Sequence, residues 1–166
     1  MKPITLIGIV LLISCQIGEP QGQSSKVASS GLTRVTATLG KARAEALFRT
    51  SVVEVSVSGE ERRKFVQCTY SRLPCSLTEN VQVLLAGKEV FIPRSAYSDL
   101  GDISAAEFGV VNSSIILTIK GGDASEAYIA VLTFNEQRLI ERRLYSGEDA
   151  KHPLEISHYY QPTTAD

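Results

Sequence analysis

The clearest pattern in the chain is a strict alternation of apolar and polar positions over three consecutive runs. In the first run Ile115, Leu117 and Ile119 fall on one face. Short turns, one of them containing Gly121 and Gly122, separate the runs, which cover residues 113–120, 128–134 and 138–145. Period-two alternation over successive runs predicts an antiparallel meander of three strands.

Shorter alternating runs occupy most of the remaining chain. They predict strands at residues 33–39, 52–57, 64–70, 81–85 and 90–92, and a last short edge strand at 154–158. Residues 41–48 allow either a short helix, because alanine favours one, or a continued strand. Residues 95–100 predict one helical turn, and residues 101–111 show no regular pattern.

Eight or nine short strands, with turns every eight to twelve residues, favour a mainly β fold. We expect an antiparallel sandwich or small barrel with one or two short helices. An α+β arrangement, with a curved antiparallel sheet, is the alternative. Residues 32–166 are enough for one hydrophobic core, so we expect a single β-rich domain there.

The first residues have the pattern of an export signal. Lys2 precedes an apolar run, Ile4 to Ile13, which is shorter than the roughly 20 residues that a membrane-spanning helix needs. The run ends Leu12-Ile13-Ser14-Cys15, which resembles the lipobox of bacterial lipoprotein precursors. The resemblance implies a signal peptide at 1–14 and an acylated Cys15 as the first mature residue. An ordinary cleaved signal or a core strand are the alternatives.

Acylation of Cys15 would attach the protein to a membrane, since several acyl chains together give stable anchoring. In the lipoprotein family, Gln16 in place of aspartate implies the periplasmic face of the outer membrane. Without the lipid, the protein would be secreted or periplasmic. Residues 15–31 are mostly polar or glycine, with Ile17, Val27 and Ala28 as exceptions, and predict a flexible linker after the lipidated cysteine.

The charge balance does not favour nucleic acid as a partner. The chain has 17 basic and 18 acidic residues and a net charge of −1. Removing Lys2 with the signal leaves 16 basic and 18 acidic residues, a net charge of −2. A nearly neutral domain offers little attraction to phosphates or to anionic lipid.

The cysteines fit an oxidising compartment. If Cys15 carries lipid, Cys68 and Cys75 remain as a pair, and we expect a disulfide that pins the loop between them. Two buried thiols or reactive cysteines are the alternatives. Metal binding usually needs closer pairs of ligands and more of them, and His152 and His158 are far away in sequence.

The sequence contains no recognisable catalytic motif. Gly121 and Gly122 lack the residues of a phosphate-binding loop, and no Gly-x-Ser-x-Gly elbow is present. A Ser/His/Asp set can be assembled only arbitrarily, from Ser113, Ser114, Asp99, Asp102 and the two histidines. We therefore predict no catalytic residue, no cofactor and no metal site.

Arginine and tyrosine are common at protein interfaces, and the third run of the meander contains several. The predicted partner-binding residues are Arg138, Arg142, Arg143 and Tyr145. Alternation places Arg138 and Arg142 on the face of Ile140 and Leu144, and Leu139 on the opposite face with Glu141, Arg143 and Tyr145. Alternatively, these charges only prevent pairing at a sheet edge.

Together these features predict a lipid-anchored envelope protein that binds another protein and is not an enzyme. An inhibitor or immunity protein and an accessory subunit of an envelope assembly both fit this description. A carrier of small apolar ligands or an envelope hydrolase is the alternative.

Overall fold

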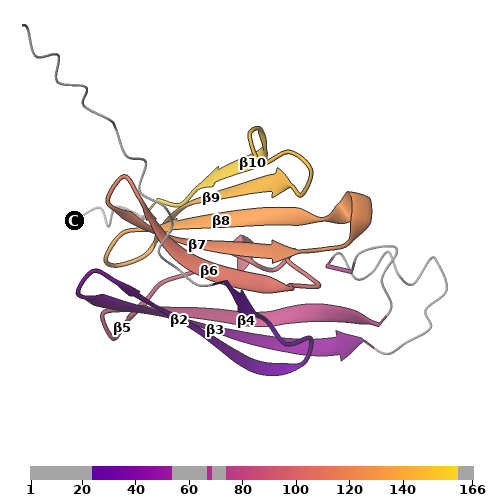
Figure 1. Cartoon of the computed structure of the whole chain (residues 1–166), viewed down its shortest axis with the longest axis horizontal. Coiled ribbons are helices and arrows are strands. Elements are labelled where there is room, and N and C mark those ends of the chain that lie inside the picture. The colour runs from indigo at the N-terminus through magenta and orange to yellow at the C-terminus, as the bar shows by residue number, and fades with distance from the viewer. Residues whose placement is uncertain (1–23, 54–66, 69–73, 161–166) are drawn as a thin grey trace, which may run out of the picture.

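Two antiparallel sheets make up the fold in the computed structural model, which describes residues 24–53, 67–68 and 74–160 (Figure 1). One sheet has the order β1-β6-β7-β8-β9-β10, and the other β2-β3-β4-β5. The strands are β1 Ser25–Lys26, β2 Gly31–Leu39, β3 Ala42–Val53, β4 Cys75–Leu85, β5 Lys88–Val90, β6 Ala105–Val111, β7 Ser114–Gly121, β8 Tyr128–Phe134, β9 Leu139–Ser146 and β10 Pro153–His158. The mainly β prediction is confirmed, and of its two forms the structure is consistent with the sandwich.

The predicted meander is strands β7, β8 and β9, which pair antiparallel in sequence order. Leu117, Leu132 and Phe134 on its inner face are buried in the same core cluster as Phe48 and Val83 of the four-stranded sheet. The alternation therefore identified the core-facing side of this sheet correctly.

The ambiguous segment at residues 41–48 lies in strand β3 from Ala42 onward, and the helix is excluded. β3 pairs with β2 on one side and with β4 on the other. Ala44, Ala46 and Phe48 all point into the core and are at most 1% exposed. Helix propensity is a weak preference, and burial of this period-two face outweighs it. The helical turn predicted at 95–100 overlaps the 3₁₀ helix η1, Arg94–Ala96, and a second one, η2, covers Ala124–Glu126.

The prediction of an irregular segment at residues 101–111 was wrong from Ala105 onward. β6 pairs with β7 along its whole length, with Phe108 opposite Leu117. Its alanines and Gly109 have low strand propensity, which concealed the pattern. Ala106 and Phe108 are nevertheless buried on the core side.

The predicted linker was too long at its C-terminal end. Ser25 and Lys26 form β1 against β6, Val27 is 3% exposed, and the Ser29 carbonyl accepts a hydrogen bond from Ser76 Oγ at 2.7 Å. Burial of Val27 and pairing of the backbone offset the entropy of ordering this segment. The folded domain therefore includes the part of the linker from Ser25 to Gly31.

A β-bulge in β9 corrects the predicted faces of that strand. Phe134 pairs with Leu139 and Thr133 pairs with Glu141, so Ile140 is an extra residue. An extra residue reverses the alternation on one side of it. Leu139 consequently faces the core together with Arg142, and not the solvent with Glu141.

Several predictions concern segments outside the described residues. These are the signal peptide, Cys15 and the beginning of the linker, and most of the strands predicted at 52–57 and 64–70. Of the latter strand, Gln67 and Cys68 are described and lie in a turn and a bend. The predicted disulfide is present: Cys68 is bonded to Cys75 at the start of β4, with the two Cα atoms 5.5 Å apart.

Candidate protein-binding surface

Exposed apolar side chains gather around the predicted last strand. Among the described residues β10 pairs only with β9, and it forms one edge of the six-stranded sheet, far from β2 and β3 (Figure 1). Leu154 and Ile156 in this strand are 70% and 47% exposed. Tyr160 just after the strand is 83% exposed, and Phe91, which follows β5, is 68% exposed. Their exposure distinguishes this edge from the core, where side chains of the same types are buried.

A hollow of about 380 Å³ lies beside the end of β10. We call it the terminal hollow. It is lined by Phe91, Pro93, Gln137, Arg138, Leu139, His158, Tyr159 and Tyr160. Arg138 is its only permanently charged lining residue, and four of the others, Phe91, His158, Tyr159 and Tyr160, have aromatic rings. A hollow of this composition suits an apolar or aromatic side chain that has a carboxylate or carbonyl nearby.

The turn before β9 places Arg138 in the terminal hollow. Asn135 Oδ1 accepts hydrogen bonds from the backbone N–H groups of Gln137 and Arg138 at 2.9 and 2.8 Å. Phe91 is tied to the same turn, because its N–H donates to Gln137 O and its carbonyl accepts from Leu139 N–H. Backbone hydrogen bonds therefore fix the relative positions of Phe91 and Arg138, although both side chains reach solvent.

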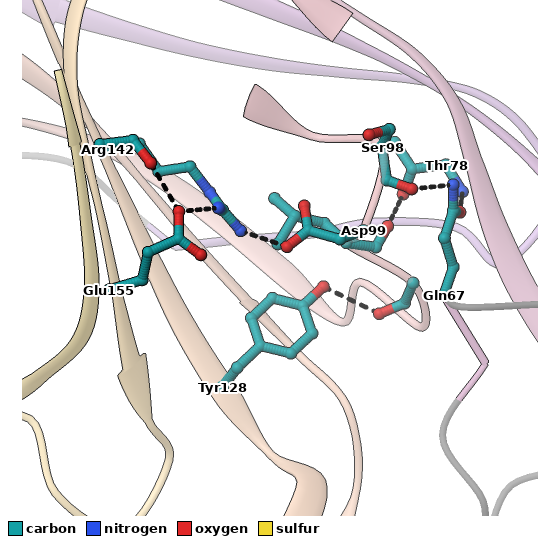
Figure 2. A network of polar contacts seen from close by, with 10 residues as sticks. Gln67, Thr78, Ser98, Asp99, Tyr128, Arg142 and Glu155 are labelled. Atoms are coloured by element: carbon teal, nitrogen blue, oxygen red, sulfur yellow. Dashed lines mark hydrogen bonds and ion pairs between the residues drawn. The ribbon is translucent and has the colours of Figure 1, made fainter. Parts of the chain in front are cut away.

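Arg142 of β9 links β10 to the segment that follows η1. Its side chain is 3% exposed and lies between two carboxylates (Figure 2): Nη1 donates to Glu155 Oε1 at 2.9 Å, and Nη2 donates to Asp99 Oδ2 at 2.5 Å. Glu155 belongs to β10, and Asp99 belongs to the segment that follows η1. One buried guanidinium thus connects the edge strand with a segment distant in sequence.

Neighbouring polar contacts hold the segment that contains Asp99. The Tyr128 hydroxyl donates to the Gly101 carbonyl at 2.8 Å. Gln67 Nε2 donates to the Ser98 carbonyl and Gln67 Oε1 accepts from Thr78 N–H, so this side chain links the segment to β4 (Figure 2). Because Gln67 precedes the disulfide-bonded Cys68, the disulfide lies at the far end of the same network.

The surroundings of Tyr128 suppress its ionisation. Burial raises the pKa of Tyr128 above the ordinary tyrosine value, and the carboxylates of Asp99 and Asp102 raise it further, while Arg142 opposes them. Tyr128 also packs closely against Gly121. A Cβ atom at position 121 would lie 2.3 Å from the Tyr128 hydroxyl oxygen, so no larger residue fits there without a shift. Tyr128 is thus a neutral hydrogen-bond donor in the folded protein.

The four arginine and tyrosine residues predicted to bind a partner lie in or next to β9 but on different surfaces. Arg138 lines the terminal hollow. Arg143 and Tyr145 lie on the outer face of the sheet, beside a second hollow of about 400 Å³, where Arg143 Nε donates to Glu141 Oε1 at 2.7 Å. Arg142 is buried between its two carboxylates, with only 3% of its side chain exposed. The bulge at Ile140 and the segment that contains Asp99, which packs against Arg142, cause these side chains to lie on different surfaces.

The sequence pattern predicted the edge strand but not the exposed apolar surface around it. Alternation of Leu154, Ile156 and His158 indicated a strand, and the structure leaves these side chains exposed. The sequence placed Phe91 within a predicted strand at 90–92, and its proximity to Arg138 depends on pairing between the two sheets. Tyr159 and Tyr160, which follow the predicted strand, both line the terminal hollow.

Both histidines and Asp99, which were considered for a catalytic set, have other partners. His152 Nδ1 lies 2.9 Å from Asp149 Oδ2, and this hydrogen bond lowers the pKa of Asp149. His158 lies 3.6 Å from Glu141, and Asp99 pairs with Arg142. Within the described ranges, no three His, Cys, Asp or Glu side chains group as metal ligands would.

Comparisons with models of protein families, with curated proteins and with solved structures give no match for this chain. Within the part of the chain that the structure describes, no helix has the length and apolar character needed to cross a bilayer.

Proposed function

We propose that the chain is a lipid-anchored envelope protein whose β domain binds another protein and catalyses no reaction. The terminal hollow carries this proposal: it combines exposed aromatic rings with one arginine, on a rigid backbone, at the end of an edge strand. Aromatic residues and arginine contribute most of the binding energy at many protein interfaces. Binding at this hollow suits an inhibitor or immunity protein, or an accessory subunit of an envelope assembly.

The packing of the core supports a binding module over a carrier of apolar ligands. Carriers built on β folds leave an apolar space inside for their ligand. Here Phe48, Phe108 and Leu117 fill the space between the sheets and are almost completely buried. The hollows lie at the surface, where another protein can reach them.

The proposed lipid anchor depends on the lipobox resemblance at Leu12 to Cys15. The disulfide between Cys68 and Cys75 supports an oxidising compartment, such as the periplasm. A tethered domain would meet partners that are confined to the same envelope at a raised effective concentration.

Affinity capture of the tagged, lipidated chain tests the proposed function. We expect one stoichiometric envelope protein to be captured, and Phe91→Ala or Arg138→Ala to reduce its recovery by about tenfold or more. Arg34→Ala is the matched control, because Arg34 is an exposed arginine of the other sheet. Recovery that neither Phe91→Ala nor Arg138→Ala reduces, an equal reduction by Arg34→Ala, or no partner at any salt concentration would contradict the proposal.

A further inference from the structure

Within the part of the chain that the structure describes, the open edge of β10 presents unpaired backbone groups at two defined positions. The Tyr159 N–H donates to the Ile140 carbonyl at 3.0 Å, and Ser157 pairs with Arg142 in the same register. In an antiparallel ladder the backbone groups of successive residues point to opposite sides. The N–H and C=O groups of Ile156 and His158 consequently point away from β9, toward the open edge.

The strand limits how far another strand could pair with it. Pro153 has no N–H to donate, and the ladder has a bulge at Leu154. Both features protect an edge from unlimited association. The usable edge is therefore the short stretch from Glu155 to Tyr160, which favours a discrete complex over a growing fibre.

We propose that β10 pairs antiparallel with β10 of a second copy of this chain, about a two-fold axis at Ser157. Ile156 of each copy then forms a hydrogen-bonded pair with His158 of the other copy. These are the same two residues whose backbone groups are free, so the edge is complementary to itself. The two six-stranded sheets become one continuous sheet. This interface shares His158, Tyr159 and Tyr160 with the terminal hollow, and it goes beyond the proposed function because its partner is a second copy of the chain.

Side chains in this register also complement each other. On the outer face Arg143 and Ile156 of one copy align with His158 and Glu141 of the second copy, because Arg143 pairs with Ile156 and Glu141 pairs with His158. Glu155 lies opposite Tyr159, so no two carboxylates or guanidinium groups stand opposite each other. The exposed Leu154 of one copy comes near the exposed Tyr160 of the other, which removes apolar surface from water.

Sedimentation of the mature chain, residues 15–166 with Cys15→Ser, tests self-pairing without a lipid. We expect a concentration-dependent dimer that Ile156→Lys weakens at least tenfold, because the added ammonium group enters the seam near Arg143. Thr36→Lys, on an exposed position of β2, is the control and leaves the dimer unchanged. A monomer at every soluble concentration would overturn the proposal. If the chain is a monomer and Ile156→Lys instead abolishes binding of a different envelope protein, the edge serves that protein and the proposal is overturned.

Cross-linking tests the register. Ser157 lies on the proposed axis, so Ser157→Cys places two thiols on neighbouring strands at the short distance of a non-hydrogen-bonded pair. We expect oxidation to give a covalent dimer with Ser157→Cys and none with Thr36→Cys. Equal cross-linking of both variants, or none in a sample that sediments as a dimer, would overturn this arrangement.

Discussion

Arg142 determines where the edge strand lies, because it is the only guanidinium among the described residues that is buried between two elements distant in sequence. It contacts Glu155 of β10 and Asp99 of the segment after η1. Both carboxylates are partly hydrated, with side chains 48% and 38% exposed, so their desolvation cost is moderate. Removing one partner of the cluster would leave a buried charge without its counter-charge, so the cluster holds β10 in its place.

Replacing Arg142 should be costly, whereas replacing its neighbour should not. We expect Arg142→Ala to lower the free energy of unfolding by about 2–3 kcal/mol, because packing is lost and two carboxylates lose their counter-charge. Arg143→Ala on the same strand should change it by less than about 0.5 kcal/mol, since its pair with Glu141 is exposed. Urea unfolding measures both variants, and similar losses for the two would contradict the assigned roles.

Tyr128 predicts a specific response to alkaline pH. Its pKa is raised in the folded protein, so above about pH 10 the unfolded chain releases a proton that the folded chain retains. Stability should thus be unaffected by this group below pH 10 and fall as the pH rises further. Tyr128→Phe should cost about 1 kcal/mol at neutral pH, through the lost bond to Gly101, and make the alkaline decline shallower.

Urea unfolding between pH 8 and pH 11 measures how steeply the stability of the wild type and of Tyr128→Phe declines. One proton can contribute at most about 1.4 kcal/mol per pH unit to this slope. Tyr160→Phe is the control, because Tyr160 is 83% exposed. Equal slopes for wild type and Tyr128→Phe would show that the hydroxyl ionises freely in the folded protein.

Among the elements, the disulfide-linked start of β4 supports the polar network from the side opposite β10. Joint replacement of Cys68 and Cys75 by serine should lower the free energy of unfolding by about 2.5 kcal/mol, from the loop entropy of a bond between residues seven apart. A reductant should destabilise the wild type by a similar amount and leave the double variant unchanged. Wild-type stability that does not respond to the reductant would contradict a stabilising role for this bond.

Elements with a clean apolar alternation could be predicted from the sequence, and elements with small residues could not. β7 and β8 follow the strict pattern of their Ile, Leu and Phe residues. β6 was missed because Ala105, Ala106 and Gly109 have weak strand propensity, and pairing with β7 decides their conformation. The alanines of β3 left helix and strand open for the same reason.

The candidate surface was harder to predict than the strands, because it depends on contacts between distant elements. The bulge at Ile140 reverses one face of β9, and nothing in the local pattern indicates it. Burial of Arg142 requires Asp99, which is 43 residues earlier in the chain. Composition favoured an arginine and tyrosine surface, and only the packing shows which of these side chains reach solvent.

At the scale of the whole molecule, the proposed anchor predicts where the domain is found. Metabolic labelling with palmitate should mark the wild type, and Cys15→Ser should abolish the label and move the protein from the membrane to the soluble fraction. The variant with serine at both Cys68 and Cys75 is the control and should keep its label. A label that persists in Cys15→Ser would show that the lipid is attached to another residue and would contradict acylation of Cys15.

Photo-cross-linking in intact cells tests most directly whether the terminal hollow binds a protein. A photoreactive residue replaces Phe91 in the full lipidated chain, and in a parallel sample it replaces Thr36 on the other sheet. The account predicts one discrete cross-linked product at position 91 that Arg138→Ala diminishes, and no such product at position 36. The same products at both positions, or none at position 91, would contradict it.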